Sequence, residues 1–109
     1  MDTDTTAAPP LHAWSSQAAL DVLAERRRQI EVEGWTPEHD DEHSACELSD
    51  AAACYALGSE AADVGDVPGC WPQSWDESWW RPSQDRRRNL VKAAALLLAE
   101  IERMDRAAG

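Results

Sequence analysis

The chain has 109 residues, with 21 acidic and 10 basic side chains and a formal net charge of −11 at pH 7. This length suits one domain with a single modest core, and the acidic excess argues against direct binding of a nucleic-acid backbone, which requires clustered Lys and Arg. Alanine and leucine dominate the apolar residues and phenylalanine is absent. Because such a composition favours helices over strands, we expect an all-α protein.

Residues 1–13 are rich in Thr, Ala and Pro. This composition is typical of a disordered arm, which leaves residues 14–109 as a single helical domain. A first helix is expected to begin after Ser15 or Ser16, either of which can serve as its N-cap, and to run to about Glu33. Its apolar face is predicted from helical spacing to contain Leu20, Leu23, Arg27 and Ile30.

The segment TPEHDDEH is expected to be a loop, because Pro37 disfavours helix before it and the acidic residues crowd closely. A second helix should begin between Asp41 and Ser44. Its buried side is predicted to be Leu48, Ala51, Ala52, Tyr55 and Ala56. After this helix, residues 64–83 are rich in Gly and Pro and include four of the six tryptophans, which indicates a long, structured crossover loop.

The third helix is expected to be capped by Ser83 and to end near Arg106. Apolar residues recur through it at helical spacing: Leu90, Val91, Ala94, Leu97, Leu98, Ile101 and Met104. This stripe is wide enough to face two neighbours. We therefore expect a small bundle of three main helices and a homodimer formed through the third helix.

The segment of residues 31–50 contains eight carboxylates and two histidines, without lysine or arginine. Mg²⁺ and Mn²⁺ accept oxygen ligands, so a few carboxylates together with substrate phosphates can complete their coordination shell. The candidate ligands are Asp40, Asp41, Glu42, His43, Glu47 and Asp50. In a second interpretation, Ser44 and Glu47 form a capping box, and the acids before them are a solvated turn that complements the helix dipole. The sequence leaves both interpretations open.

The tryptophans of the crossover loop also allow two interpretations. They can cover a core that lacks phenylalanine, or they can form a stacking platform for a nucleobase whose phosphates meet nearby cations. The candidate ligand-binding residues are Trp35, Trp79, Trp80, Arg81 and Lys92. Because Trp79 and Trp80 are adjacent, we expect one to be buried and the other to line a groove beside the acidic segment.

The three cysteines, Cys46, Cys54 and Cys70, form no CxxC pair. Their number and spacing indicate neither a disulfide framework nor a thiolate zinc site, so reduced thiols are expected. No apolar run approaches the roughly 20 residues of a membrane span, and the start MDTDTTAAPP lacks the basic region of a signal peptide. These features predict a protein in the cytoplasm of a bacterial host cell, without membrane contact.

Four segments carry a resemblance: ERRRQIEVEGWTPEHDDEH, ELSDAAACYA, WPQSWDESWWRP and RRRNLVKAAALLLAEIERMDR. Together they resemble a family of small, largely uncharacterised acidic proteins encoded by phages and prophages. More distantly, the acidic segment followed by Glu-Leu-x-x-Ala-Ala is similar to the metal-binding helix of the all-α, MazG-like nucleotide pyrophosphohydrolases. That resemblance implies an oligomeric helical bundle in which paired carboxylates hold Mg²⁺. Glu47 matches one of those carboxylates, and Ser44 takes the place of its partner.

Together, these observations predict a phage-derived protein that binds a nucleotide or another small phosphate ligand through a divalent cation, with hydrolysis of a phosphoanhydride by metal-activated water as its candidate reaction. Two other classes of function fit the same residues. One is a non-catalytic phage module that sequesters a nucleotide signal or inhibits a host protein. The other is an acidic decoy that occupies the DNA-binding surface of a host protein.

Overall fold

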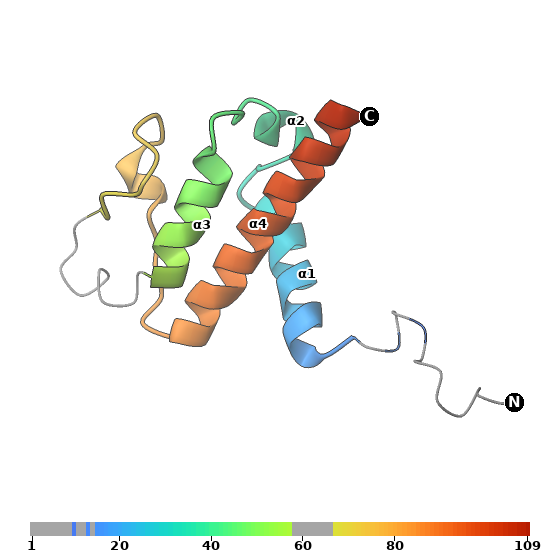
Figure 1. Ribbon diagram of the computed structural model, residues 1–109. Helices are drawn as coiled ribbons and strands as arrows, with labels where there is room; N and C mark the ends of the chain where they lie inside the picture. Colours follow the sequence, from blue (N-terminus) through green and yellow to red (C-terminus); the bar gives the residue numbers. More distant parts are fainter. Residues whose placement is uncertain (1–9, 11–12, 14, 58–66) are drawn as a thin grey trace, which may run out of the picture.

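The computed structural model describes residues 10, 13, 15–57 and 67–109. Within these residues it contains five helical elements and no strand, so the expected all-α fold is confirmed. The elements are α1 (Gln17–Glu31), α2 (Pro37–Asp40), α3 (Glu47–Leu57), the 3-10 turn η4 (Glu77–Trp79) and α4 (Arg86–Ala108). The long helix α4 is central: α3 and α1 both pack against it, and the short α2 lies near its C-terminal end (Figure 1). The expected disordered arm, residues 1–13, lies almost entirely outside the described residues.

Helix α1 begins where the sequence predicts but buries a different face. Ser16 is its N-cap, and the hydroxyl of Ser16 accepts a hydrogen bond from the backbone N–H of Ala19. The predicted apolar face is turned outward, since Leu20 and Leu23 are exposed. The residues buried in the bundle are instead polar: Glu25, Arg26 and Gln29. That prediction was wrong because ion pairs satisfy the charges of Glu25 and Arg26 inside the bundle.

The segment predicted to be a loop contains α2. The hydroxyl of Thr36 caps this helix by accepting the backbone N–H of His39 at 3.2 Å. Pro37 occupies the first helical position, where a missing N–H costs no intrahelical hydrogen bond. The same proline that disfavours helix before it therefore starts a helix after it.

Helix α3 starts at Glu47, later than predicted, and the capping box is absent. The carboxylate of Glu47 accepts the N–H of Ala45 at 2.7 Å instead of that of Ser44. Cys46, directly before the helix, has a positive φ of 70°, a conformation unlike that of an ordinary N-cap. Further along, the predicted buried side is confirmed for four residues: Leu48, Ala51, Ala52 and Tyr55.

A disulfide joins Cys54 in the last turn of α3 to Cys70 in the tryptophan-rich segment. The prediction of reduced thiols without a pairing was therefore wrong for these two residues. The two cysteines are 16 positions apart, and their Cα atoms are 6.1 Å apart. No local motif announces such a pair, because it depends on how the crossover returns to α3. Cys46 is a free, exposed thiol.

The core lies between α3, α4 and the tryptophan-rich segment. Trp71 and Trp75 are each only 5% exposed, which supports the core-covering interpretation for these two rings. On α4 the N-cap is Asp85, whereas Ser83 exchanges two backbone hydrogen bonds with the side chain of Asn89. The core face of α4 is rich in alanine: Val91, Ala93, Ala95, Leu96 and Ala99. Among the helices of the described residues, none is long and apolar enough to cross a membrane.

Candidate functional site

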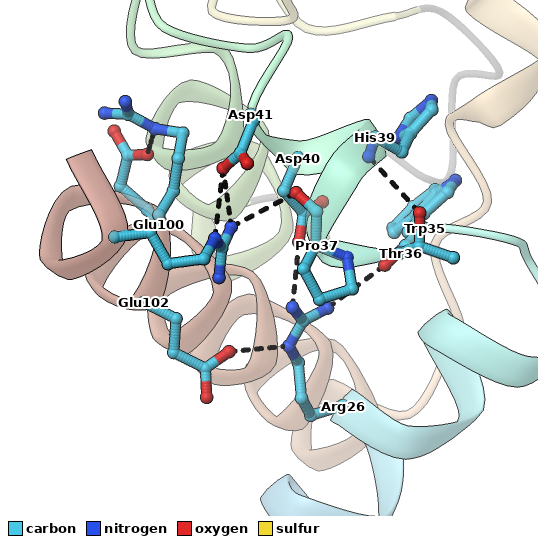
Figure 2. Close-up of polar contacts among 11 residues, drawn as sticks. Arg26, Trp35, Thr36, Pro37, His39, Asp40, Asp41, Glu100 and Glu102 are labelled. Carbon is cyan, nitrogen blue, oxygen red and sulfur yellow. Dashed lines mark hydrogen bonds and ion pairs between the residues drawn. The ribbon is translucent and has the colours of Figure 1, made fainter. Parts of the chain in front are cut away.

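Asp40, one of the candidate metal ligands, is 1% exposed and lies against Arg26 of α1. The guanidinium of Arg26 donates to the Asp40 carboxylate at 2.8 Å, to the carboxylate of Glu102 at 3.1 Å and to the backbone oxygen of Trp35 at 3.3 Å. Figure 2 shows this guanidinium between the three acceptors. Burial raises the pKa of Asp40 more than the positive charge of Arg26 lowers it. Arg26 thus ties α1 to α2 and α4.

The other candidate metal ligands are dispersed. Asp41 accepts two hydrogen bonds from Arg106, which also donates to the backbone oxygen of Pro37 (Figure 2). Glu42 and Asp50 are exposed. In the part of the chain that the structure describes, no group of three or more His, Cys, Asp or Glu side chains is placed to hold a metal ion. The site for Mg²⁺ or Mn²⁺ therefore stays a prediction from the sequence.

His43 contacts neighbouring aromatic rings more closely than it contacts the carboxylates. Its Nδ1 atom accepts the indole N–H of Trp75 at 3.3 Å, and its ring lies edge-on to that of His39, with centroids 4.8 Å apart. The nearest carboxylate oxygen of Glu47 is 4.0 Å from Nδ1. Burial and the neighbouring His39 lower the pKa of His43. A neutral imidazole that accepts an indole proton is therefore the form that this site favours.

A separate pocket of about 180 Å³ lies between α1, α3, α4 and the segment that follows η4. Four of the chain's ten basic side chains line it: Arg28, Arg81, Arg88 and Lys92. Aromatic side chains form much of the remaining wall: Trp35, Tyr55 and Trp79. Cationic and aromatic groups therefore converge here from four different parts of the chain.

The buried carboxylate of Glu25 fixes two of these cations. Arg28 donates to both of its oxygens, at 2.8 and 2.9 Å, and Arg88 donates to one at 2.6 Å. Burial alone would raise the pKa of Glu25, but the hydrogen bonds from Arg28 and Arg88 outweigh it, and the pKa is lowered. The carboxylate therefore stays ionised and orients both guanidiniums. Each guanidinium carries five N–H donors, so donors remain for a ligand.

Tyr55 and Lys92 hold the segment from Trp79 to Arg81 in place beside the pocket. The hydroxyl of Tyr55 donates to the backbone oxygen of Trp79 at 3.1 Å and accepts the backbone N–H of Arg81 at 3.0 Å. Lys92 donates to the backbone oxygen of Arg81 at 2.7 Å, and its ammonium lies 5.6 Å from the centre of the Tyr55 ring. Burial, and then the nearby Arg88, lower the pKa of Lys92. The segment from Trp79 to Arg81 is thus fastened to both α3 and α4.

A second pocket of about 300 Å³ adjoins the first. It shares four lining residues with the first pocket: Glu33, Trp35, Trp79 and Arg81. Its own lining is completed by Val32, Gly34 and His39. We call the two compartments together the cationic–aromatic groove, defined by the residues that line these two pockets.

Electrostatically, the first compartment differs from the rest of the molecule. Glu25 and Glu33 are the two carboxylates at its four cations, which leaves a formal excess of two positive charges. The chain as a whole has a net charge of −11. An anion therefore meets locally favourable charge here and unfavourable charge over most of the remaining surface.

The structure brings together four of the five candidate ligand-binding residues in this groove: Trp35, Trp79, Arg81 and Lys92. Trp80 lines neither compartment and packs instead on Tyr55 and Trp71, with ring centroids 4.7 and 5.4 Å away. Trp79 lines the groove, as was expected of one member of the pair, but both adjacent tryptophans are only partly buried, so the expected buried member is not found.

Sequence reasoning missed Arg28, Tyr55 and Arg88 as members of the groove, and it missed Glu25 as the carboxylate that orients the two arginines. The available signal was the pair of Arg-Arg-Arg runs, one in α1 and one at the start of α4, in an otherwise acidic chain. Comparison of the chain with protein-family models, curated proteins and solved structures found no match.

Proposed function

We propose that the protein binds a mononucleotide in the cationic–aromatic groove, with the phosphate at Arg28, Arg88 and Lys92 and the base beside Trp35 and Trp79. One observation carries this proposal: in a chain of net charge −11, four of ten basic side chains line one pocket with three aromatic rings. Surface charge that serves solubility alone has no reason to converge in this way.

The cations suit a phosphate group. Guanidinium groups form paired, charge-assisted hydrogen bonds with phosphate oxygens, and Glu25 already holds Arg28 and Arg88 in fixed orientations. Lys92 is partly buried and its pKa is lowered, so a bound anion would stabilise its charged form. The ligand thereby gains from a site whose cations are ordered before it arrives.

The aromatic residues suit a nucleobase. Trp35 and Trp79 line both compartments, and stacking of one base on an aromatic side chain contributes about 1–3 kcal/mol. The two compartments together have the volume of an ordinary small-molecule site, which is on the order of 300–1,000 Å³. Arg81 lies at both compartments, where the sugar and phosphate would join the base.

The proposed function is binding alone, and it corresponds most closely to a non-catalytic module that sequesters a nucleotide. Hydrolysis is not assigned, because Asp40 and Asp41 are held by arginines and Glu47 by a backbone N–H. Each binding assay is therefore run both with and without Mg²⁺. If binding requires Mg²⁺, the acidic segment of residues 31–50 would again be a candidate for holding the cation.

The test is calorimetric titration of the protein with adenosine and guanosine monophosphates, the corresponding nucleosides and inorganic phosphate. Arg28→Gln should weaken nucleotide binding at least tenfold, since a hydrogen bond to a charged group is worth about 1.5–3 kcal/mol. The matched control is Arg27→Gln, which alters the exposed neighbour on the same helix and should leave affinity unchanged. Equal affinities in both variants, or equal losses, would contradict the proposal. If inorganic phosphate binds as tightly as the nucleotides and the nucleosides do not bind, the groove is an anion site without a site for the base.

A further inference from the structure

Helix α4 leaves an apolar row exposed on the side opposite the groove. Leu90, Leu97, Ile101 and Met104 are 40, 46, 56 and 55% exposed. With 3.6 residues per turn, their spacings of seven, four and three place them on one face of the helix, whereas Arg88, Lys92 and Leu96 face the groove. We call these four residues the α4 stripe.

It is unusual for four large apolar side chains on one helix face to be this exposed to water. Helix α4 buries a face that consists mainly of alanine together with Leu96 and Val91, and it leaves four other large apolar side chains in water. Burial of apolar surface contributes roughly 25 cal/mol per Å², and contiguous exposed apolar patches commonly mark interaction sites. A second apolar surface is therefore the chemistry that the stripe fits.

The charges beside the stripe indicate which apolar surface would pack against it. Arg87 precedes Leu90 and Asp105 follows Met104, and the two are 18 positions apart, which is five full helical turns. The two opposite charges therefore project on the same flank, one at each end of the stripe. Arg87 is paired with Asp21 at 2.8 Å, but its side chain is still 57% exposed and has N–H donors to spare.

We propose that a second copy of this chain docks along the α4 stripe, antiparallel to the first, with Leu97 at the two-fold axis. In this arrangement Leu90 of each copy meets Met104 of the other, and Arg87 of each copy lies near Asp105 of the other. A parallel pair would set Arg87 against Arg87 and Asp105 against Asp105. The antiparallel interface is isologous and closes as a dimer, and it leaves the groove of each copy facing outward.

The first experiment measures the molar mass by light scattering and sedimentation over a range of concentrations. The native chain should approach twice its 12.1 kDa mass as its concentration rises. Leu97→Glu places two carboxylates at the axis and should give a monomer. Leu57→Glu is the matched control, because Leu57 is 75% exposed on α3 and is not part of the α4 stripe, and its substitution should leave the dimer intact. A native chain that stays monomeric at about 1 mM, or equal dissociation of both variants, would overturn the proposal.

The second experiment tests the orientation. Arg87→Glu and Asp105→Arg should each weaken the dimer at low salt, because each sets like charges opposite one another. An equimolar mixture of the two variants should form the dimer more tightly than either alone, since every pair across the mixed interface is then of opposite charge. A mixture no tighter than its components would exclude the antiparallel register. Thermal melting of each variant separates loss of the dimer from loss of the fold.

Discussion

Substitution of Arg26 by methionine tests a buried cation that binds acceptors on three different parts of the chain. The guanidinium of Arg26 is buried and bonds Asp40, Glu102 and the backbone oxygen of Trp35. Its removal leaves the Asp40 carboxylate, 1% exposed, without its cation. Breaking a buried pair in this way destabilises a protein by about 3–5 kcal/mol, a large part of the roughly 5–15 kcal/mol that holds a small domain folded.

The assay is urea unfolding followed by circular dichroism, with Arg27→Met as the control on the same helix. Arg27 is exposed, so its substitution should change the free energy of unfolding by less than about 0.5 kcal/mol. The difference between Arg26→Met and the native chain should also shrink in acid. Without Arg26 the folded-state pKa of Asp40 rises further above the value of 3.8 for an unperturbed aspartate, and protonation then removes the unpaired charge. If Arg26→Met is no less stable than Arg27→Met, the ion pair does not hold the fold.

Three further outcomes are expected. Burial and the neighbouring His39 lower the pKa of His43 below 6.5, so the unfolded chain binds a proton at a higher pH than the folded chain; the free energy of unfolding should therefore be full above pH 6.5 and fall as the pH drops toward the folded-state pKa. Urea titrations across this range measure the slope, and replacing His43 should flatten it while removing the contact to Trp75. Reduction of the Cys54–Cys70 disulfide should lower stability by about 3 kcal/mol, the value for a loop of about 15 residues, and an unchanged melting curve in a dithiol reductant would refute this. Millimolar Mg²⁺ should leave the melting temperature unchanged, because Asp41 is held by Arg106; a rise that Asp41→Asn abolishes would reinstate the cation site.

The sequence was most informative for α3. The spacing of Leu48, Ala51, Ala52 and Tyr55 predicts the buried face, because that face is apolar and its opposite is not. For α4 the same reasoning selected a face that is mostly exposed. Of the predicted stripe, Val91 is buried but Leu90, Leu97, Ile101 and Met104 lie outside, since the small alanine side chains allow α3 to approach closely and the tryptophan rings supply the missing volume. Periodicity identifies an apolar face but does not reveal which neighbour covers it.

Polar pairs between distant parts of the chain also limit what can be predicted from the sequence. Glu25 and Arg26 have the composition of surface residues, and only their partners on other elements make them buried. Likewise, Arg28 and Arg88 are 60 positions apart and meet because both bind Glu25. The aromatic half of the groove was accessible from sequence because Trp35 and Trp79 are conspicuous in so small a chain. Among the cations, Arg81 and Lys92 were also candidates from the sequence, but Arg28 and Arg88 required the packing of α1 on α4.

The contrast between the groove and the rest of the surface has a consequence for the kind of anion that can enter it. Electrostatic interactions in physiological salt fade over about 8 Å, so a small anion inside the groove responds mainly to the four cations around it. A long polyanion, by contrast, extends past the groove over the acidic surface and is repelled along its length. If the groove binds a phosphate-bearing ligand as proposed, the net charge of −11 would make it selective for size, favouring a single small anion over a nucleic-acid strand.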